Sequence, residues 1–192
     1  MKFVIEHLTE KLYDWCLIEY RHISRIVGKK NLIFTNVKNP ADIKKLKNLG
    51  EVKRESALKL NLKNACLLDP KAKDTLKVNE AKNFDYFIFG GILGDFPEQG
   101  RTNKYLTSKL RSVEVRNLTE KQMSTDTAVL VTKIISKGTG LNDIKFIDNP
   151  SIVLKKGRLQ EEANLPYRYV SENGKPIISK ELLMYLKNKK DL

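Results

Sequence analysis

Residues that commonly hold metal ions or form disulfides are scarce in this sequence. Among its 192 residues are two cysteines, Cys16 and Cys66, and two histidines, His7 and His22. No C-x-x-C pair is present, and neither histidine is spaced from another plausible ligand so that both share one helical face. Both cysteines stand in apolar stretches, which predicts buried thiols. The sequence therefore indicates no metal chemistry and no disulfide exchange.

Long apolar runs are also missing. No run approaches the roughly 20 residues that a membrane-spanning helix needs. The first seven residues reach a charged side chain too soon for a secretory signal, so we expect a cytoplasmic protein with no membrane partner. A composition of 41% hydrophobic and 31% charged residues is typical of a globular chain, and the length predicts one domain over residues 1–192.

Positive charge is abundant. Lysine and arginine number 36 against 23 acidic residues, which gives a formal net charge of +13 at pH 7. A field of this sign favours polyanions or the ribosome surface as partners. The alternative is a solvated, ion-paired surface of the kind that heat-adapted proteins carry. Aromatic residues are not interleaved with the lysines, so no platform for stacking bases is predicted.

Strand and helix patterns alternate along the chain. Thr9 is expected to cap a helix that runs to about Val27 and ends at Gly28, and Asn39-Pro40 opens a second helix. A third helix is predicted at 125–136. Apolar runs predict strands at 3–5, 31–37, 65–68, 84–89, 113–118 and 144–147. This alternation predicts an α/β fold with a mostly parallel sheet and helices on both faces.

A glycine-rich turn follows the predicted strand at 84–89. It reads Gly90-Gly91-Ile92-Leu93-Gly94-Asp95, and ligands of open α/β sheets bind where strands end in this way. The turn matches neither the phosphate-binding nor the dinucleotide-binding glycine pattern. The carboxylate of Asp95 would repel a pyrophosphate but tolerate a sulfonium, which favours S-adenosylmethionine. A side chain at Gly91 is expected to enter the cofactor's space. A tight turn without a ligand is the alternative.

The polar segment 116–128 is a second candidate for contact with a ligand. Thr127 and the free backbone groups of the turn are able to hydrogen-bond an adenine edge, while Leu118 and Met123 would cover its faces. The alternative is structural, because Ser124, Thr125 or Asp126 can each cap the following helix.

Five segments, taken in order, resemble one branch of the SPOUT methyltransferases. They are 89–95, 100–102, 116–118, 122–128 and 166–170. The branch includes the fungal SPOUT protein arginine methyltransferase and its archaeal relatives. An ordered agreement over almost the whole chain is more specific than any single glycine motif.

The resemblance implies a deep trefoil knot within about 84–170, with S-adenosylmethionine bent among three loops. The implied cofactor-binding residues are Gly90, Gly91, Leu93, Gly94, Val115, Asn117, Leu118, Met123, Thr125 and Thr127. It also implies methyl transfer to an arginine of a small-subunit ribosomal protein by a monomer, although a homodimer is the commoner SPOUT arrangement.

Arginine methylation needs carboxylates that orient the guanidinium and help it to lose a proton. Asp95 is the first candidate and Glu98 the second; Arg101 is expected to anchor the cofactor carboxylate or a substrate phosphate, or to pair with one of these acids. Two other functions stay open. One is methylation of tRNA or rRNA, with Asp95 as the base, and the other is ribosome or RNA binding without catalysis.

Overall fold

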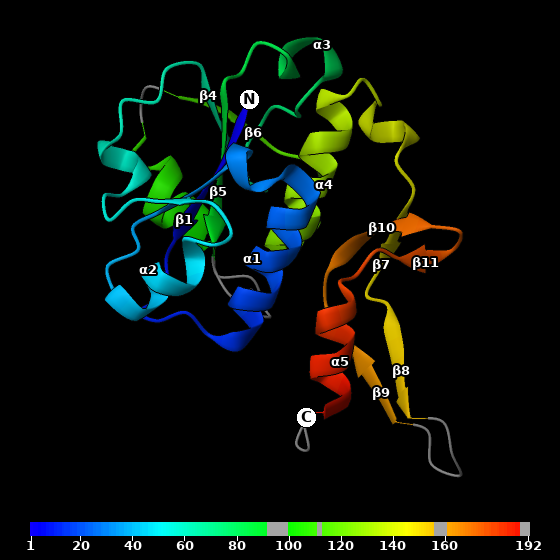
Figure 1. The fold of residues 1–192 in the computed structure, drawn as a ribbon. Helices are drawn as coiled ribbons and strands as arrows, with labels where there is room; N and C mark the ends of the chain where they lie inside the picture. The colour runs from blue at the N-terminus through cyan, green and yellow to red at the C-terminus, as the bar shows by residue number, and fades with distance from the viewer. Residues whose placement is uncertain (92–99, 111–112, 156–160, 189–192) are drawn as a thin grey trace.

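A six-stranded parallel sheet forms the centre of the N-terminal part of the molecule, and the C-terminal strands and helix lie to one side of it (Figure 1). The computed structural model describes residues 1–91, 100–110, 113–155 and 161–188. Every neighbouring pair of strands in this sheet is parallel, as the sequence predicts. In spatial order the strands are β3 (Glu51–Val52), β2 (Leu32–Thr35), β1 (Lys2–His7), β5 (Tyr86–Gly91), β4 (Ala65–Leu68) and β6 (Glu114–Arg116).

Apolar residues cover both faces of the central strands. In β1, Phe3 and Ile5 belong to the large core on one face, whereas Val4 belongs to a second core on the opposite face. Successive side chains of a strand point to opposite faces, so a continuous run of apolar residues is stable only where both faces are covered. The apolar strand sequences therefore require a layer on each side of the sheet.

The two faces carry different layers. The α-helices that contribute to the large core are α1 (Asp14–Val27), α2 (Pro40–Leu46), α3 (Val78–Ala81) and α4 (Thr125–Ser136). Two short helical segments, Ala57–Lys59 and Asn103–Thr107, place Ala57 and Leu106 in the opposite core. Further single turns span Lys29–Asn31 and Leu141–Asp143.

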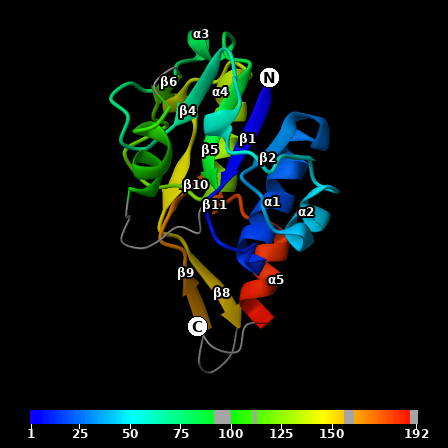
Figure 2. The same ribbon diagram turned by 90° about the vertical axis from the view of Figure 1, so that its left-hand side faces the viewer.

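The C-terminal part packs against α1 and α4. It comprises β7 (Phe146–Asp148), β8 (Ser151–Lys155), β9 (Glu161–Asn164), β10 (Arg168–Glu172), β11 (Lys175–Pro176) and α5 (Lys180–Asn188). Ile18 of α1 shares a core with Tyr169 and Leu182, and α5 lies beside α1 in both views (Figures 1 and 2). The antiparallel pair β8 and β9 extends away from the parallel sheet (Figure 2).

One predicted helix start is wrong. The first helix begins at Asp14, and Thr9 does not cap it. Thr9 Oγ1 instead donates a hydrogen bond to the Lys11 carbonyl at 2.9 Å, and the Leu12 amide donates to Asp42 Oδ2 at 3.1 Å. Because a distant carboxylate takes this amide, the chain bends at residues 9–11 without forming a helical turn, and the helix begins only at Asp14.

Other predictions agree with the structure. The helix predicted at 125–136 has those bounds, Gly28 follows the end of α1, and Asn39 caps α2 by accepting a hydrogen bond from the Ala41 amide at 2.9 Å. The parallel α/β fold class is confirmed. The knot stays a prediction, because the segment 92–99 lies outside the described residues. The assignment of one domain to residues 1–192 also stays a prediction.

Both cysteines are buried with free thiols, as predicted. Burial raises the pKa of the Cys16 and Cys66 thiols to about 12, which leaves them protonated and unreactive near neutral pH. Among the residues that the structure describes, no helix combines the length and apolar character needed to cross a membrane.

Candidate functional site

The carboxyl ends of the parallel strands share one edge of the sheet, and β1 and β5 end there side by side. His7 pairs in register with Gly91, and the Leu8 amide donates to the Gly91 carbonyl at 3.2 Å. The glycine turn predicted to hold a ligand therefore begins directly beside the last residue of β1. This edge is where ligands of open parallel sheets bind.

The N-terminus of α4 reaches the same place. Thr125 Oγ1 lies 3.5 Å from the Gly90 carbonyl oxygen, so the structure brings the first and third predicted cofactor segments together. Thr125 and Thr127 are buried, whereas Met123 is partly exposed. The polar groups at this helix N-terminus and the apolar side chain of Met123 suit a ligand with both polar and apolar parts, although the Thr127 amide itself donates to Asp126 Oδ1 at 2.9 Å.

The second predicted cofactor segment lies at the end of β6, with β4 between it and β5. Val115 is partly exposed and Leu118 is buried. Both polar groups of the Asn117 side chain form hydrogen bonds within the protein. Its Nδ2 donates to the Ala72 carbonyl at 2.8 Å, and its Oδ1 accepts from Thr75 Oγ1 at 2.9 Å. The side chain of Asn117 thus holds the neighbouring loop, and its contact with a cofactor stays a prediction.

The space beside Gly91 differs from the expectation. A Cβ atom at Gly91 would lie 2.3 Å from the Tyr20 hydroxyl and 2.6 Å from Ile5 Cγ2. A side chain there would therefore enter the packed layer between β5 and α1 rather than a ligand space. Glycine at position 91 allows the Tyr20 hydroxyl to approach the backbone closely. This contact was not predicted from the sequence.

Several predicted residues cannot be placed. Leu93, Gly94, Asp95 and Glu98 lie outside the described residues, so their roles stay predictions. Arg101 follows Gly100, where the described chain resumes; it starts the helical segment that leads to Asn103–Thr107 and is partly exposed.

A chain of hydrogen bonds surrounds His7 at the end of β1. Its Nδ1 lies 3.1 Å from the Tyr20 hydroxyl, and its Nε2 lies 3.3 Å from Thr9 Oγ1. Burial lowers the pKa of His7, and the charge of Asp42 opposes that shift only in part, so the ring is neutral near pH 7. Thr9 already donates to Lys11, so Nε2–H donates to Thr9 and the unprotonated Nδ1 accepts from the Tyr20 hydroxyl, whose other contact, with the Gly91 carbonyl oxygen, is longer at 3.4 Å.

Behind the start of α4 lies a buried polar cluster. Asp126 Oδ2 is 2.7 Å from His22 Nδ1, and Asp126 Oδ1 accepts from Ser124 Oγ at 2.6 Å and from the Thr127 amide at 2.9 Å. The Tyr169 hydroxyl is also buried, with no hydrogen-bond partner among the described residues. These bonds fix the backbone of the third predicted cofactor segment from behind.

Glu19 faces the same cluster from α1. Burial raises its pKa to about 8, the charge of Asp126 adds to the shift, and hydrogen bonds from Trp15 and Thr125 oppose it. Trp15 Nε1 donates to Glu19 Oε1 at 2.8 Å. No sequence pattern singled out this residue; a carboxylate between the apolar residues Ile18 and Tyr20 was the signal available in the sequence.

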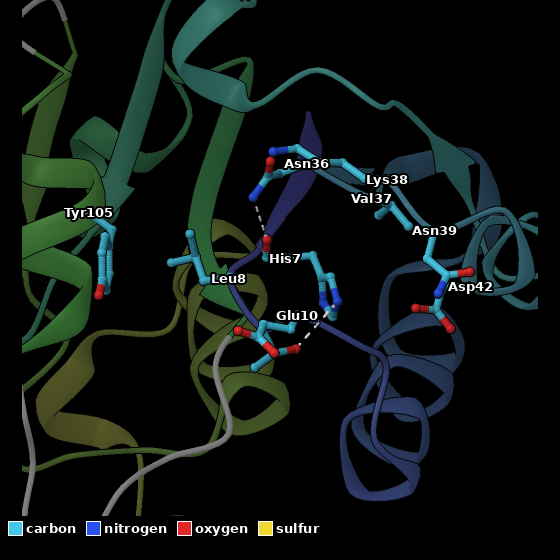
Figure 3. A pocket seen from close by; sticks show the side chains of 10 residues that line it. His7, Leu8, Glu10, Asn36, Val37, Lys38, Asn39, Asp42 and Tyr105 are labelled. Atoms are coloured by element: carbon cyan, nitrogen blue, oxygen red, sulfur yellow. Dashed lines mark hydrogen bonds between the residues drawn. The ribbon is translucent and has the colours of Figure 1, made fainter.

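A cavity of about 310 Å³ opens at the carboxyl ends of β1 and β2 (Figure 3). Asp42 and Tyr105 lie on opposite sides of it, with His7 and Leu8 between them. Its lining comes from three separate parts of the chain: His7, Leu8, Thr9, Glu10, Asn36, Val37, Lys38, Asn39, Asp42 and Tyr105. No sequence motif pointed to this set.

The described residues contain no group of three or more histidine, cysteine or acidic side chains that could hold a metal ion. What the fold and the edge of the sheet define is an α/β protein of the SPOUT methyltransferase kind. The solved structure of Trm10 from Thermococcus kodakaraensis shares this fold, with a TM-score of 0.57 and 17% identity over 74% of this chain and 95% of that one.

The chain belongs to the SFM1-like family of protein arginine N-methyltransferases, whose model matches residues 2–192. It is 38% identical to protein arginine N-methyltransferase SFM1 of Saccharomyces cerevisiae, over 97% of this chain and 94% of that protein. Crystal structures of yeast SFM1 with SAH and with SAM each align with a TM-score of 0.87 at 37% identity. Both alignments cover 97% of this chain, and they cover 94% and 89% of the yeast chains, respectively. The resemblance seen in the sequence motifs is confirmed.

Proposed function

We propose that this protein transfers the methyl group of S-adenosylmethionine to an arginine side chain of a ribosomal protein. The observation that carries the proposal is the likeness to yeast SFM1, which extends over 97% of the chain. Family membership and the complexes of that relative with SAM and SAH confirm the predicted S-adenosylmethionine-dependent methyltransferase. The ribosomal protein and the cytoplasmic location are the finer parts of the proposal.

The described residues fit such a cofactor. Gly90 offers partly exposed backbone without a side chain, and Met123 is a partly exposed apolar side chain of the third segment. Val115 of the second segment packs against the core on the opposite face of the sheet, so its contact with the cofactor stays a prediction. Thr125 lies beside the carbonyl of Gly90. Backbone polar groups at strand and helix ends, with a few apolar side chains, are the usual lining of a nucleoside site.

The reaction is a displacement at the methyl carbon. A guanidinium nitrogen of the substrate forms the new C–N bond, the C–S bond breaks, and the sulfonium becomes a neutral thioether. The guanidinium gives up one proton to a base, and the predicted residues for that role are Asp95 and Glu98. Alignment of the nitrogen with the methyl group and removal of the proton are the two tasks of the protein.

The net charge of +13 bears on the form of the substrate. A basic ribosomal protein alone would be repelled by this field, whereas the same protein bound to ribosomal RNA presents a negative surface. We therefore propose the RNA-bound protein or the small subunit as the preferred substrate. Raising the salt concentration should slow methylation of that form most strongly, because salt screens the attraction.

Incubation with radiolabelled S-adenosylmethionine tests the proposal. Small ribosomal subunits, free ribosomal proteins and protein-free RNA are supplied separately, and label is measured in the protein and RNA fractions. Recovery of labelled methylarginine after acid hydrolysis of the protein is the expected result. Label confined to RNA would support the RNA methyltransferase alternative, and cofactor binding without transfer to any fraction would support a non-catalytic binder.

We also propose that the protein acts as a monomer, as the resemblance implies. Light scattering should then give the mass of one 22.1 kDa chain. Twice that mass would indicate the homodimer instead.

A further inference from the structure

The cavity at the ends of β1 and β2 presents hydrogen-bond acceptors. Asp42 Oδ2 accepts from the Leu12 amide, and no hydrogen bond reaches Oδ1 among the described residues. Asn36 Nδ2 donates to the His7 carbonyl at 2.7 Å, which leaves its Oδ1 similarly available within the described part of the chain. Glu10 adds an exposed carboxylate. Acceptors from three directions suit a ligand that has only donors.

The cavity also has an apolar wall. Leu8 is partly buried and Val37 is 1% exposed, and both line the cavity between the polar groups (Figure 3). A ligand that fits has an apolar stem and a cationic, donor-rich head. Arginine has this form, because three methylene groups carry a planar guanidinium with five N–H donors.

Charge in the cavity favours a cation, although the chain as a whole is strongly basic. Glu10 and Asp42 are acidic, Lys38 is the cation of the lining, and His7 is held neutral by its burial. Each carboxylate is able to form a charge-assisted hydrogen bond with a guanidinium. The volume of about 310 Å³ lies at the lower end of the range for ligand pockets, roughly 300–1,000 Å³, and suits one side chain.

The position of the cavity connects it with the predicted cofactor site. His7 and Leu8 line the cavity, and they are the residues that meet Gly91 at the end of β5. Adjacent strands lie about 4.8 Å apart, so this wall of the cavity is one strand from the start of the glycine turn. A guanidinium held here would lie close to a methyl donor bound at that turn.

We propose that this cavity binds the arginine side chain of the substrate, with Asp42 and Glu10 holding its guanidinium and Leu8 and Val37 packing on its stem. The inference rests on the proposed arginine methylation and names the residues that would select arginine. Neutral analogues of arginine should be excluded, because they leave the two carboxylates without a cationic partner.

Binding of a small probe tests the cavity without turnover. The full-length protein, saturated with S-adenosylhomocysteine, is titrated with N-acetyl-arginine amide and, separately, with N-acetyl-citrulline amide, and NMR shifts are followed. Citrulline has nearly the same shape without the charge. Binding of the arginine probe should be about tenfold tighter or more, the ratio typical of one charge-assisted hydrogen bond. Equal binding of both probes, or no binding of the arginine probe, would overturn the proposal.

Two variants locate the binding. Asp42→Asn keeps an acceptor for the Leu12 amide, and Glu10→Gln changes an exposed side chain that holds nothing else in the described structure. Each substitution should weaken binding of the arginine probe at least about threefold, and the double variant should weaken it about tenfold or more. Glu172→Gln, an exposed acid on β10, is the matched control and should leave binding unchanged. A melting scan checks that the Asp42→Asn variant is folded. If that variant is unfolded, the effect of Glu10→Gln on binding of the arginine probe decides the proposal.

Affinity for S-adenosylhomocysteine, measured by calorimetry on the same variants, should stay within about twofold of the parent. If the variants weaken binding of S-adenosylhomocysteine instead of the arginine probe, the cavity binds the cofactor and the proposal is wrong. If the protein binds the arginine probe as expected but transfers label only to RNA, the cavity selects arginine as proposed and the proposed function is wrong. In an active enzyme, the two variants should raise KM for the protein substrate more than they lower kcat.

Discussion

His7 Nδ1 and the hydroxyl oxygen of Tyr20 lie 3.1 Å apart, at the point where the end of β1 meets α1. The same hydroxyl lies 3.4 Å from the carbonyl oxygen of Gly91. One phenol thus contacts the last residues of two neighbouring strands, beside both the predicted cofactor turn and the proposed arginine cavity. The position of each strand end depends on the helix layer behind it.

Replacing Tyr20 with phenylalanine should destabilise the protein by about 1–3 kcal/mol, because the buried His7 ring would lose its partner. Tyr185→Phe is the matched control. Its ring meets Trp15 edge-on, and no hydrogen bond of its hydroxyl is seen among the described residues, so a change within about 0.5 kcal/mol is expected. Urea unfolding of both variants measures the difference, and equal midpoints would show that the His7 contact contributes nothing.

Gly91→Ala should destabilise the fold, and it should lower cofactor affinity only as a consequence. The new Cβ would overlap the Tyr20 hydroxyl and Ile5, and such overpacking costs about 1–3 kcal/mol. Because the hydroxyl is the nearer clash, Gly91→Ala should cost less in a Tyr20→Phe background than in the parent. A double-mutant cycle in urea measures this coupling. Additive effects, with cofactor binding lost from a fully stable protein, would instead favour a ligand space beside Gly91.

Glu19 should make stability depend on pH. Its folded-state pKa of about 8 lies above the ordinary value of 4.5, so the folded protein holds this proton more tightly than the unfolded chain. Its contribution is complete below about pH 4.5 and is lost as pH rises to about 8, with a slope of at most ~1.4 kcal/mol per pH unit. Glu19→Gln should flatten the pH dependence of the unfolding free energy between about pH 4.5 and 8, whereas the exposed control Glu172→Gln should not. If the slope of unfolding free energy against pH is unchanged in Glu19→Gln, Glu19 is not the cause of the pH dependence.

Asp95 is the predicted base, although it lies outside the described residues. Asp95→Asn should leave cofactor affinity nearly unchanged and lower turnover by about 10² or more, as expected for loss of an acid–base group. Glu98→Gln serves as the comparison, with a smaller loss expected from the second candidate. Calorimetry, melting temperature and methyl transfer are measured on the same preparations, and normal turnover in Asp95→Asn would exclude it from the chemistry.

Local patterns predicted most of the fold. The strand that becomes β5 and the helix α4 are each specified by contiguous apolar periodicity and by the residues at their ends, so a short window contains the information. Thr9 failed as a helix cap because the competing bond, from the Leu12 amide to Asp42, joins residues 30 positions apart. No local pattern contains such a contact.

The candidate site was predicted only in part, for a similar reason. The glycine turn and the 122–127 segment carry recognisable motifs, and the structure brings them together at Gly90 and Thr125. The arginine cavity is assembled from residues 7–10, residues 36–39, Asp42 and Tyr105. These residues share no motif and meet only when β1, β2, α2 and the 101–107 segment are placed. Glu19 was not predicted, because its burial depends on the packing of α1 against α4, which no local pattern in the sequence contains.

The C-terminal part holds the third predicted cofactor segment in position. The Arg168 amide donates to the Gln122 carbonyl at 2.9 Å, and Asp148 pairs with both Arg168 and Lys121. Chimeras that exchange the C-terminal part between relatives should therefore be joined before Lys121 rather than after Ser136. A junction after α4 would separate the segment from the strands that support it, whereas the earlier junction transfers both together.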